Sequence, residues 1–248
     1  MSGICGIINI DGKPVNVKEL KQMTELLEFR GPDGTNMWIN GNVGFGHTLF
    51  ITASQPENQP LTLDGKVYLT ADARIDATAE LIPQLQTMGS RVTDQATAAE
   101  LILHAYKVWG EDFLSHLLGD FAFALWDKEK QKLLCGRDHF GLRVLYYAQI
   151  RQTFVFSNVI KCLQDYPGVR KKLNDVTIGD FLLFGQGHYW LDKSITLWED
   201  INKVPPAHFL SLDLSGNKLI KPYWHFPWDT PHLQYNDDEE VLVSFGTG

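Results

Sequence analysis

The first apolar run of the chain is short, is interrupted by glycine and covers residues 3–10. It ends at Asp11-Gly12, and an apolar run of this length before such a turn signal predicts a buried strand. Helical spacing follows, at Val17, Leu20, Met23, Leu26 and Leu27. This helix is expected to stop before 30–34 (Arg-Gly-Pro-Asp-Gly), where glycine and proline favour a tight turn.

The rest of the chain alternates short strand-like segments with longer amphipathic ones. The segment 97–109 is a clear helix prediction, because Leu101, Ile102, Ala105 and Trp109 fall on one side of it. A second clear helix is predicted over 77–87. Further strands are predicted over 36–39, 43–49, 67–71, 119–127, 133–138, 144–148, 153–157 and 209–213, and further helices over 159–163 and 177–183.

Many short strands with helices before, between and after them predict an α+β layered protein. The character of the chain changes after residue 226, where proline, asparagine and acidic residues dominate. We therefore expect a folded domain over 1–226 and a solvated acidic linker or tail over 227–248.

Composition and charge narrow the function classes. Of the 248 residues, 44% are hydrophobic and 21% are charged, which is typical of a globular protein. The net charge of −8 and the lack of a long basic run argue against nucleic-acid binding, and no apolar stretch is long enough to span a membrane. Three widely separated cysteines and the lack of a signal peptide predict a cytoplasmic protein with buried thiols. No histidine or cysteine spacing predicts a metal site, and no cofactor is expected.

The candidate chemistry lies at the start of the chain. If Met1 is removed, Ser2 carries both a hydroxyl and a free α-amine, which is the nucleophile and base of a terminal-nucleophile enzyme. Cys5 is the only nearby rival, but it is too far along the chain to share that amine. It is expected to be a buried strand thiol. Ser2 is therefore either a working nucleophile or the remnant of one.

Several short motifs occur in an order typical of one family. Together they resemble the glutaminase domain of class II glutamine amidotransferases, and in particular the N-terminal half of the asparagine synthetase B type, over residues 1–226. The motifs are Met1-Ser2-Gly3-Ile4-Cys5-Gly6, Arg30-Gly31-Pro32-Asp33, Gly46-His47, Gln59-Pro60-Leu61, residues 119–127, Gly136-Arg137-Asp138 with Gly141, Leu145-Tyr146-Tyr147, Phe156-Ser157, Val204-Pro205-Pro206 and Tyr223-Trp224.

The resemblance implies a four-layer αββα sandwich of the N-terminal-nucleophile hydrolase type. It also implies glutamine hydrolysis by a cysteine that directly follows the removed methionine, with ammonia used by a C-terminal ATP-dependent synthetase domain. No Ser-Gly-Gly-Leu-Asp-Ser-type pyrophosphate loop occurs in this sequence. The expected partner is therefore a synthetase-like (ATP-pyrophosphatase) domain or chain, and a homodimer is a further possibility.

The sequence departs from the family at the glutamine site. Ser2 takes the place of the nucleophilic cysteine, and Leu49 takes the place of the arginine that holds the glutamine α-carboxylate. Ala71-Asp72-Ala73 aligns with the family's Asn-Gly-Glu, which supplies an oxyanion contact and binds substrate. Ala98 replaces the aspartate that holds the substrate ammonium, and Asp94, four residues earlier, is not expected to substitute for it. Loss of two charged hydrogen bonds removes about 3–6 kcal/mol of binding, or about 10²–10⁴ in affinity, and a lost oxyanion donor costs about 10²–10³ in rate.

Other polar residues have structural interpretations. An Arg30–Asp33 ion pair is expected to hold the tight turn, Arg137-Asp138 is expected to form a strand-end turn, and His47 is expected to be a hydrogen-bonded core histidine. Asp72, Arg74 and Asp76 form either mutual salt bridges or a re-purposed polar site.

Three functions stay open on the sequence. The first is a degenerate glutaminase retained as a scaffold or regulatory module for a synthetase-like partner. The second is an active N-terminal serine amidohydrolase with a changed substrate, which uses Ser2 and the Asp72/Arg74 cluster. The third is a glutaminase subunit that supplies ammonia for asparagine synthesis.

Overall fold

The structure is a computed structural model of the chain, and it describes residues 1–51, 57–185 and 192–226. The expected acidic linker or tail over 227–248 lies outside these residues. Two antiparallel sheets form the centre of the molecule. The first sheet has the strand order β2-β3-β1-β8-β7-β9, and the second has the order β11-β10-β6-β5-β4.

The first sheet is built around the N-terminal strand, which pairs with β3 on one side and with β8 on the other. Its strands are β1 (Gly3–Asn9), β2 (Gly34–Asn40), β3 (Val43–Leu49), β7 (Tyr146–Ile150), β8 (Thr153–Ser157) and β9 (Asn202–Lys203). The strands of the second sheet are β4 (Val67–Asp76), β5 (Leu118–Asp127), β6 (Lys132–Arg137), β10 (His208–Asp213) and β11 (Lys218–Pro222).

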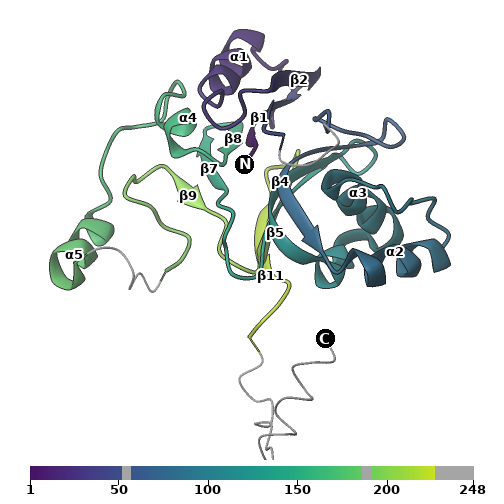
Figure 1. Cartoon of the computed structure of the whole chain (residues 1–248). Helices are drawn as coiled ribbons and strands as arrows, with labels where there is room; N and C mark the ends of the chain where they lie inside the picture. The colour runs from purple at the N-terminus through teal and green to yellow at the C-terminus, as the bar shows by residue number, and fades with distance from the viewer. Residues whose placement is uncertain (52–56, 186–191, 227–248) are drawn as a thin grey trace, which may run out of the picture.

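Helices cover the outer face of each sheet (Figure 1). Apolar residues of α1 (Val17–Glu25) and α4 (Ile160–Gln164) share a core with the outward-facing residues of the first sheet. On the second sheet, α2 (Thr78–Thr87), α3 (Ala98–Trp109) and the 3-10 helix Gly110–His116 do the same. A third core lies between the sheets. The predicted four-layer αββα sandwich is confirmed.

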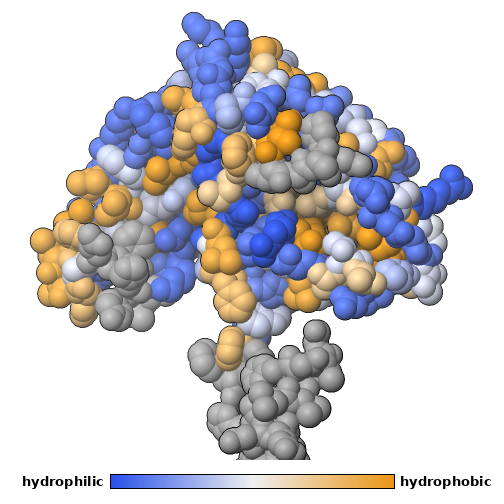
Figure 2. All heavy atoms as spheres, viewed as in Figure 1, coloured by the Kyte–Doolittle hydropathy of each residue, from blue (hydrophilic) through white to orange (hydrophobic). Residues whose placement is uncertain are grey.

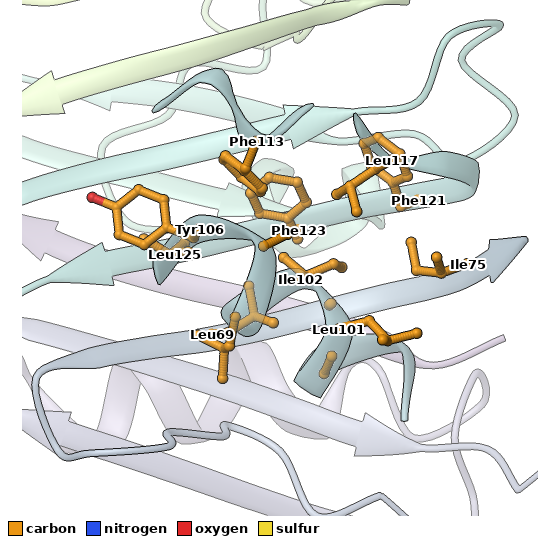
Figure 3. Close-up of a cluster of buried hydrophobic side chains, with 14 of the residues drawn as sticks. Leu69, Ile75, Leu101, Ile102, Tyr106, Phe113, Leu117, Phe121, Phe123 and Leu125 are labelled. Atoms are coloured by element: carbon orange, nitrogen blue, oxygen red, sulfur yellow. The ribbon is translucent and has the colours of Figure 1, made fainter. Parts of the chain in front are cut away.

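The packing of α3 on β4 and β5 shows how the apolar periodicity of a helix and that of two strands produce one buried layer. Figure 3 shows Leu101, Ile102 and Tyr106 of α3 lying over Leu69 of β4 and Phe123 of β5. Because side chains four apart share one face of a helix and alternate side chains share one face of a strand, both periodicities bury the same cluster. This packing fixes the N-terminal end of α3 beside the ends of the two sheets.

Most predicted elements are present, but some boundaries were wrong. The strand predicted over 67–71 continues to Asp76, and the strand predicted over 144–148 begins only at Tyr146. The second shift arises because the backbone N–H groups of Phe140, Leu142 and Arg143 all donate to the Asp138 carboxylate and close a turn there. The short strands β9 and β11 and the 3-10 helix were not predicted, since none of them has a distinct apolar period.

One helix stands apart from the layers. In Figure 1, α5 (Asp175–Phe184) lies at the lower left, away from both sheets. Its apolar side chains are largely exposed, and Figure 2 shows apolar surface gathered at this place. Among the described residues, no helix has the length and apolar content needed to cross a bilayer.

Candidate functional site

A cleft of about 500 Å³ opens at the end of the sandwich where β1 begins and β3 ends. Gly3 of β1 pairs with Thr48 of β3 in the first sheet, so Ser2 and Leu49 lie at the same end of these two strands. The residues that the sequence resemblance assigns to the glutamine site all line this cleft, together with Arg74. They come from both sheets and from the start of α3. They are Ser2, Leu49, Ala71, Asp72, Ala73, Arg74 and Ala98.

Ser2 is anchored through its backbone more than through its hydroxyl. Its carbonyl oxygen accepts hydrogen bonds from Arg30 Nε (3.2 Å) and Asn158 Nδ2 (2.9 Å). Its hydroxyl oxygen accepts from the Phe50 N–H at 3.3 Å. Within the described parts of the chain, no basic side chain is hydrogen-bonded to this hydroxyl. The α-amine of Met1 also lies in the cleft, and burial lowers its pKa from the usual value.

Asp72 is a buried carboxylate that links the two sheets. Its Oδ2 lies 3.0 Å from Arg30 Nη2, 3.3 Å from Asn158 Nδ2 and 3.7 Å from Arg143 Nη1. Only 6% of its side chain is exposed. Arg30 and Asn158 also hold the Ser2 carbonyl, so Asp72 positions the chain terminus through two intermediaries.

The predicted Arg30–Asp33 ion pair was wrong. Arg30 pairs with Asp72, and Asp33 instead accepts a hydrogen bond from the Ile51 N–H at 2.8 Å. The reason is that the glycine–proline turn points the two side chains toward different neighbours. A sequence motif alone does not show that a buried carboxylate on another sheet competes for the arginine.

The charged cluster on β4 divides into two parts. Arg74 pairs with Asp76 (3.0 Å) and with Asp120 on β5 (3.4 Å), and 63% of its side chain is exposed. Of the two alternatives left open for this cluster, mutual salt bridging describes Arg74 and Asp76, whereas Asp72 pairs with Arg30.

The buried side-chain amide of Gln59 is hydrogen-bonded to the backbone in the middle of β4. Gln59 accepts a hydrogen bond from the Ala71 N–H at 2.5 Å and donates to the Ala71 carbonyl at 3.1 Å. Gln59 also donates to Glu57, whose other carboxylate oxygen accepts from the Ala99 N–H at the start of α3. Ala98 follows the N-cap Thr97, which forms a capping box with Glu100.

Sequence reasoning missed Glu57 and Arg143 as lining residues. Glu57 lies in a segment with no periodic pattern, so nothing in the sequence places it against α3. Arg143 enters the cleft because the turn at Asp138 folds back, and this turn confirms the prediction for Arg137-Asp138. Arg137 completes the turn by donating to the carbonyls of Gly141, Arg143 and Val204.

Two titratable side chains of the first sheet, Cys5 and His47, are fully buried. Cys5 is fully buried in β1, so the prediction of a buried strand thiol is confirmed, and burial raises the pKa of this thiol far above its usual value. His47 is also fully buried, but neither of its ring nitrogens has a hydrogen-bond partner in the structure. The expectation of a hydrogen-bonded core histidine was wrong. Burial lowers the His47 pKa to about 4, so the ring is neutral near pH 7.

In the described part of the chain, no group of three or more His, Cys, Asp or Glu side chains has the arrangement of a metal site. The cleft contains the hydroxyl of Ser2, the buried carboxylate of Asp72 and two further carboxylates near α3, those of Glu57 and Asp94. Leu49, Ala73 and Ala98, the residues that the resemblance implies stand at glutamine-site positions, bring no charged side chain to this cleft.

Comparisons with known proteins agree with this architecture. Residues 1–224 match the sequence model of the glutamine amidotransferase domain. The glutamine-hydrolyzing asparagine synthetase 3 of Bacillus subtilis is 28% identical over 230 residues, which are 91% of this chain and 37% of that protein. Amidase chry2 of Gibberella zeae is 29% identical over 237 residues, which are 88% of this chain and 32% of that protein. The chain thus spans about a third of the length of these relatives.

Among solved structures, the glutamine phosphoribosylpyrophosphate amidotransferase of B. subtilis superimposes with a TM-score of 0.64 at 15% identity, over 90% of this chain and 50% of that one. Two antiparallel sheets between helical layers, with the first strand starting at a cleft, define the sandwich fold of the N-terminal-nucleophile amidotransferases. The match over residues 1–224 shows that the chain belongs to the glutamine amidotransferase domain family.

Proposed function

We propose that residues 1–226 form a glutamine amidotransferase-type domain of an asparagine synthetase-like protein that has lost glutamine hydrolysis. It serves instead as a scaffold or regulatory module for a synthetase-type domain. The observation that carries this proposal is the lining of the cleft. Leu49, Ala73 and Ala98 present no charge to a glutamine, and the buried carboxylate of Asp72 is already engaged by Arg30 and Asn158.

The combined losses in glutamine affinity and in reaction rate support a lost glutaminase activity rather than a weakened one. Two missing ionic contacts, at Leu49 and Ala98, remove about 10²–10⁴ in glutamine affinity. Replacement of the oxyanion contact at Ala71 removes about another 10²–10³ in rate. Ser2 adds a further loss, because a hydroxyl is a weaker nucleophile than a thiol at neutral pH.

The length of the relatives supports a synthetase-type partner, since this chain matches about a third of each. The helix α5 supports it as well. Leu182 and Leu183 are each 76% exposed, and a group of exposed apolar side chains is typical of a surface that other protein covers. The three free and buried thiols favour a reducing, cytoplasmic setting.

The test is release of ammonia from L-glutamine by the purified chain, with and without a synthetase-type partner from the same source. A cysteine-type glutaminase is run as the positive control. The proposal expects no release above the blank in either condition. Saturable release by the wild type that is abolished by Ser2→Ala would overturn it, and release that requires the partner would favour an ammonia-supplying subunit.

A second candidate is an active N-terminal serine amidohydrolase with a changed substrate. It is favoured by the position of Ser2, whose carbonyl is fixed by Arg30 and Asn158 while its hydroxyl lines the cleft. This candidate requires a free Ser2 amine. Retention of Met1 in the intact mass of the native protein would exclude it.

A further inference from the structure

Strand β2 is the last strand at one side of the first sheet, and it pairs with β3 alone. Within the described residues, no further strand or isolated bridge covers its other side. A strand in this position presents every second backbone N–H and C=O group to the side without a neighbour. Such a row of groups is a template for one kind of partner, which is another β-strand.

The turn after β2 shows which of its residues present these groups. Residues 41–42 alone connect β2 to β3, and Asn40 lies opposite Val43. The two residues that close such a hairpin exchange hydrogen bonds, so alternate residues of β2, counted back from Asn40, bond to β3. The Leu49 carbonyl of β3 accepts from the Asp33 N–H just before β2 begins, which agrees with this alternation. The residues whose backbone groups point away from the sheet are Thr35, Met37 and Ile39.

The other strands at sheet edges are protected against a further strand, whereas β2 is not. β11 carries two lysines and a proline, which disfavour pairing at an edge. β9 has only two residues and is bridged by Ile195. The outer side of β4 is closed by a bridge from Leu61 and by the side chain of Gln59. The sequence of β2, Gly34–Asn40, contains neither a charged residue nor a proline.

The edge formed by β2 is both accessible and held in place. Met37, at the centre of the strand, is 40% exposed. The next residue, Trp38, stacks on Tyr68 of β4 with ring centroids 3.9 Å apart, so the second sheet supports β2 from behind. A strand that is already ordered loses little conformational entropy when another strand pairs with it.

We propose that two copies of this chain associate through β2, as an antiparallel pair with the two-fold axis at Met37. The first sheets of the two copies then form one continuous sheet. A strand that pairs antiparallel with its own copy makes an isologous contact, and β2 is complementary to itself over its full length. Thr35 of one copy lies opposite Ile39 of the other, which allows about six backbone hydrogen bonds. Because β2 carries no charge, no like charges face each other across the pair.

Sedimentation velocity of the full chain, from low micromolar to submillimolar concentration, tests this proposal. A reversible monomer–dimer equilibrium is expected. Met37→Lys is expected to weaken dimerisation at least about tenfold, because it places two like charges opposite each other at the axis. Leu219→Lys is the matched control, since Leu219 is 47% exposed on the edge strand β11. It is expected to change the dimerisation constant less than about twofold.

Engineered cysteines test the arrangement of the two strands. The three native cysteines are free and buried, so an added surface cysteine is expected to be the reactive one. At the axis, the two copies of residue 37 have Cα atoms about 5.5 Å apart, which is within the reach of a disulfide. Diamide oxidation of Met37→Cys is therefore expected to give a covalent dimer. Thr35→Cys is expected to give none, because its two copies lie about 13 Å apart along the strands.

Several results would overturn the proposal. One is a chain that stays monomeric at all concentrations, and another is a dimer that Met37→Lys leaves intact. A dimer lost in Leu182→Glu combined with Leu183→Glu, but kept in Met37→Lys, would place self-association on α5. A monomeric chain whose β2 variants weaken binding of a synthetase-type chain would show that β2 pairs with a different protein. None of these measurements uses glutamine, so they stand apart from the test of the proposed function.

Discussion

The carboxylate of Asp72 lies 3.0 Å from the guanidinium of Arg30, and this contact joins strand β4 of the second sheet to the segment that holds the chain terminus. Arg30 donates through Nε to the carbonyl of Ser2 and through Nη2 to Asp72. The position of Ser2 is therefore coupled to a buried charge 70 residues away in the sequence.

Replacement of Asp72 by asparagine is expected to destabilise the domain by about 2–4 kcal/mol. The change leaves the largely buried cations Arg30 and Arg143 without their shared counter-charge, and removal of one partner of a buried ion pair is costly. Urea denaturation at neutral pH measures the effect. Asp76→Asn is the control, because the Asp76–Arg74 pair is exposed and is worth less than about 1 kcal/mol. Equal effects of the two substitutions would contradict the buried role of Asp72.

His47 predicts a pH dependence of stability. Burial lowers its pKa from 6.5 to about 4 in the folded protein, so the unfolded chain binds a proton at a higher pH than the folded chain does. The contribution of this pKa difference to the free energy of unfolding is fully present above pH 6.5. It is lost as the pH falls toward 4, by about 3 kcal/mol in all. The measurement is the free energy of unfolding of wild type and His47→Leu between pH 7.5 and 4.5.

The leucine variant is expected to lack this component of the pH dependence. It is also expected to be about as stable as the wild type at pH 7.5, since it replaces a buried ring without hydrogen-bond partners by an apolar group. Parallel pH curves for the two proteins would show that His47 does not titrate as described.

The exposed apolar side chains of α5 predict that a synthetase-type chain binds to this helix. Leu182→Glu combined with Leu183→Glu is expected to weaken binding of a synthetase-type chain from the same source at least tenfold, because it places charge on apolar surface that the proposed partner would cover. Thermal stability of the isolated domain is expected to change little, since both side chains are 76% exposed. Affinity measured by biolayer interferometry, with Lys18→Glu on α1 as the control, distinguishes docking from a general charge effect. Unchanged affinity in the double variant would place the interface elsewhere.

The sequence predicts the layers of this fold well because each layer depends on local periodicity. Segments such as 97–109 and 153–157 have one apolar period that matches the observed element closely. The helix α5 was also predicted, but its exposure was not, because an apolar pattern does not show what covers it. The short strand β9 depends on two residues that pair with β7, and such long-range pairing leaves no local pattern.

The site was predictable where it depends on aligned motif positions and not where it depends on tertiary contacts. The positions of Ser2, Leu49 and Ala98 came from motif order, and the structure brings them to one cleft. The Arg30–Asp72 pair and the entry of Arg143 arise from the meeting of the two sheets. The family motifs therefore locate the cleft, while its electrostatics follow from the three-dimensional arrangement.

Restoration of the nucleophile alone is expected to fail. Ser2→Cys places a thiol at the terminus, but Leu49, Ala71 and Ala98 still offer glutamine neither an ionic contact nor an oxyanion contact, so no glutamine-dependent ammonia release above the blank is expected. A coupled ammonia assay over a range of glutamine concentrations measures this. Rescue by Ser2→Cys alone would show that the cleft still recognises glutamine.

Whether this cleft has lost glutamine chemistry is decided by intact mass spectrometry of the native protein before and after incubation with an electrophilic glutamine analogue, a diazoketone. A cysteine-type glutaminase treated in parallel shows that the reagent is active. The mass of this chain is expected not to change, whether or not Met1 has been removed. Covalent addition of one analogue at Ser2, absent from Ser2→Ala and prevented by excess glutamine, would contradict it.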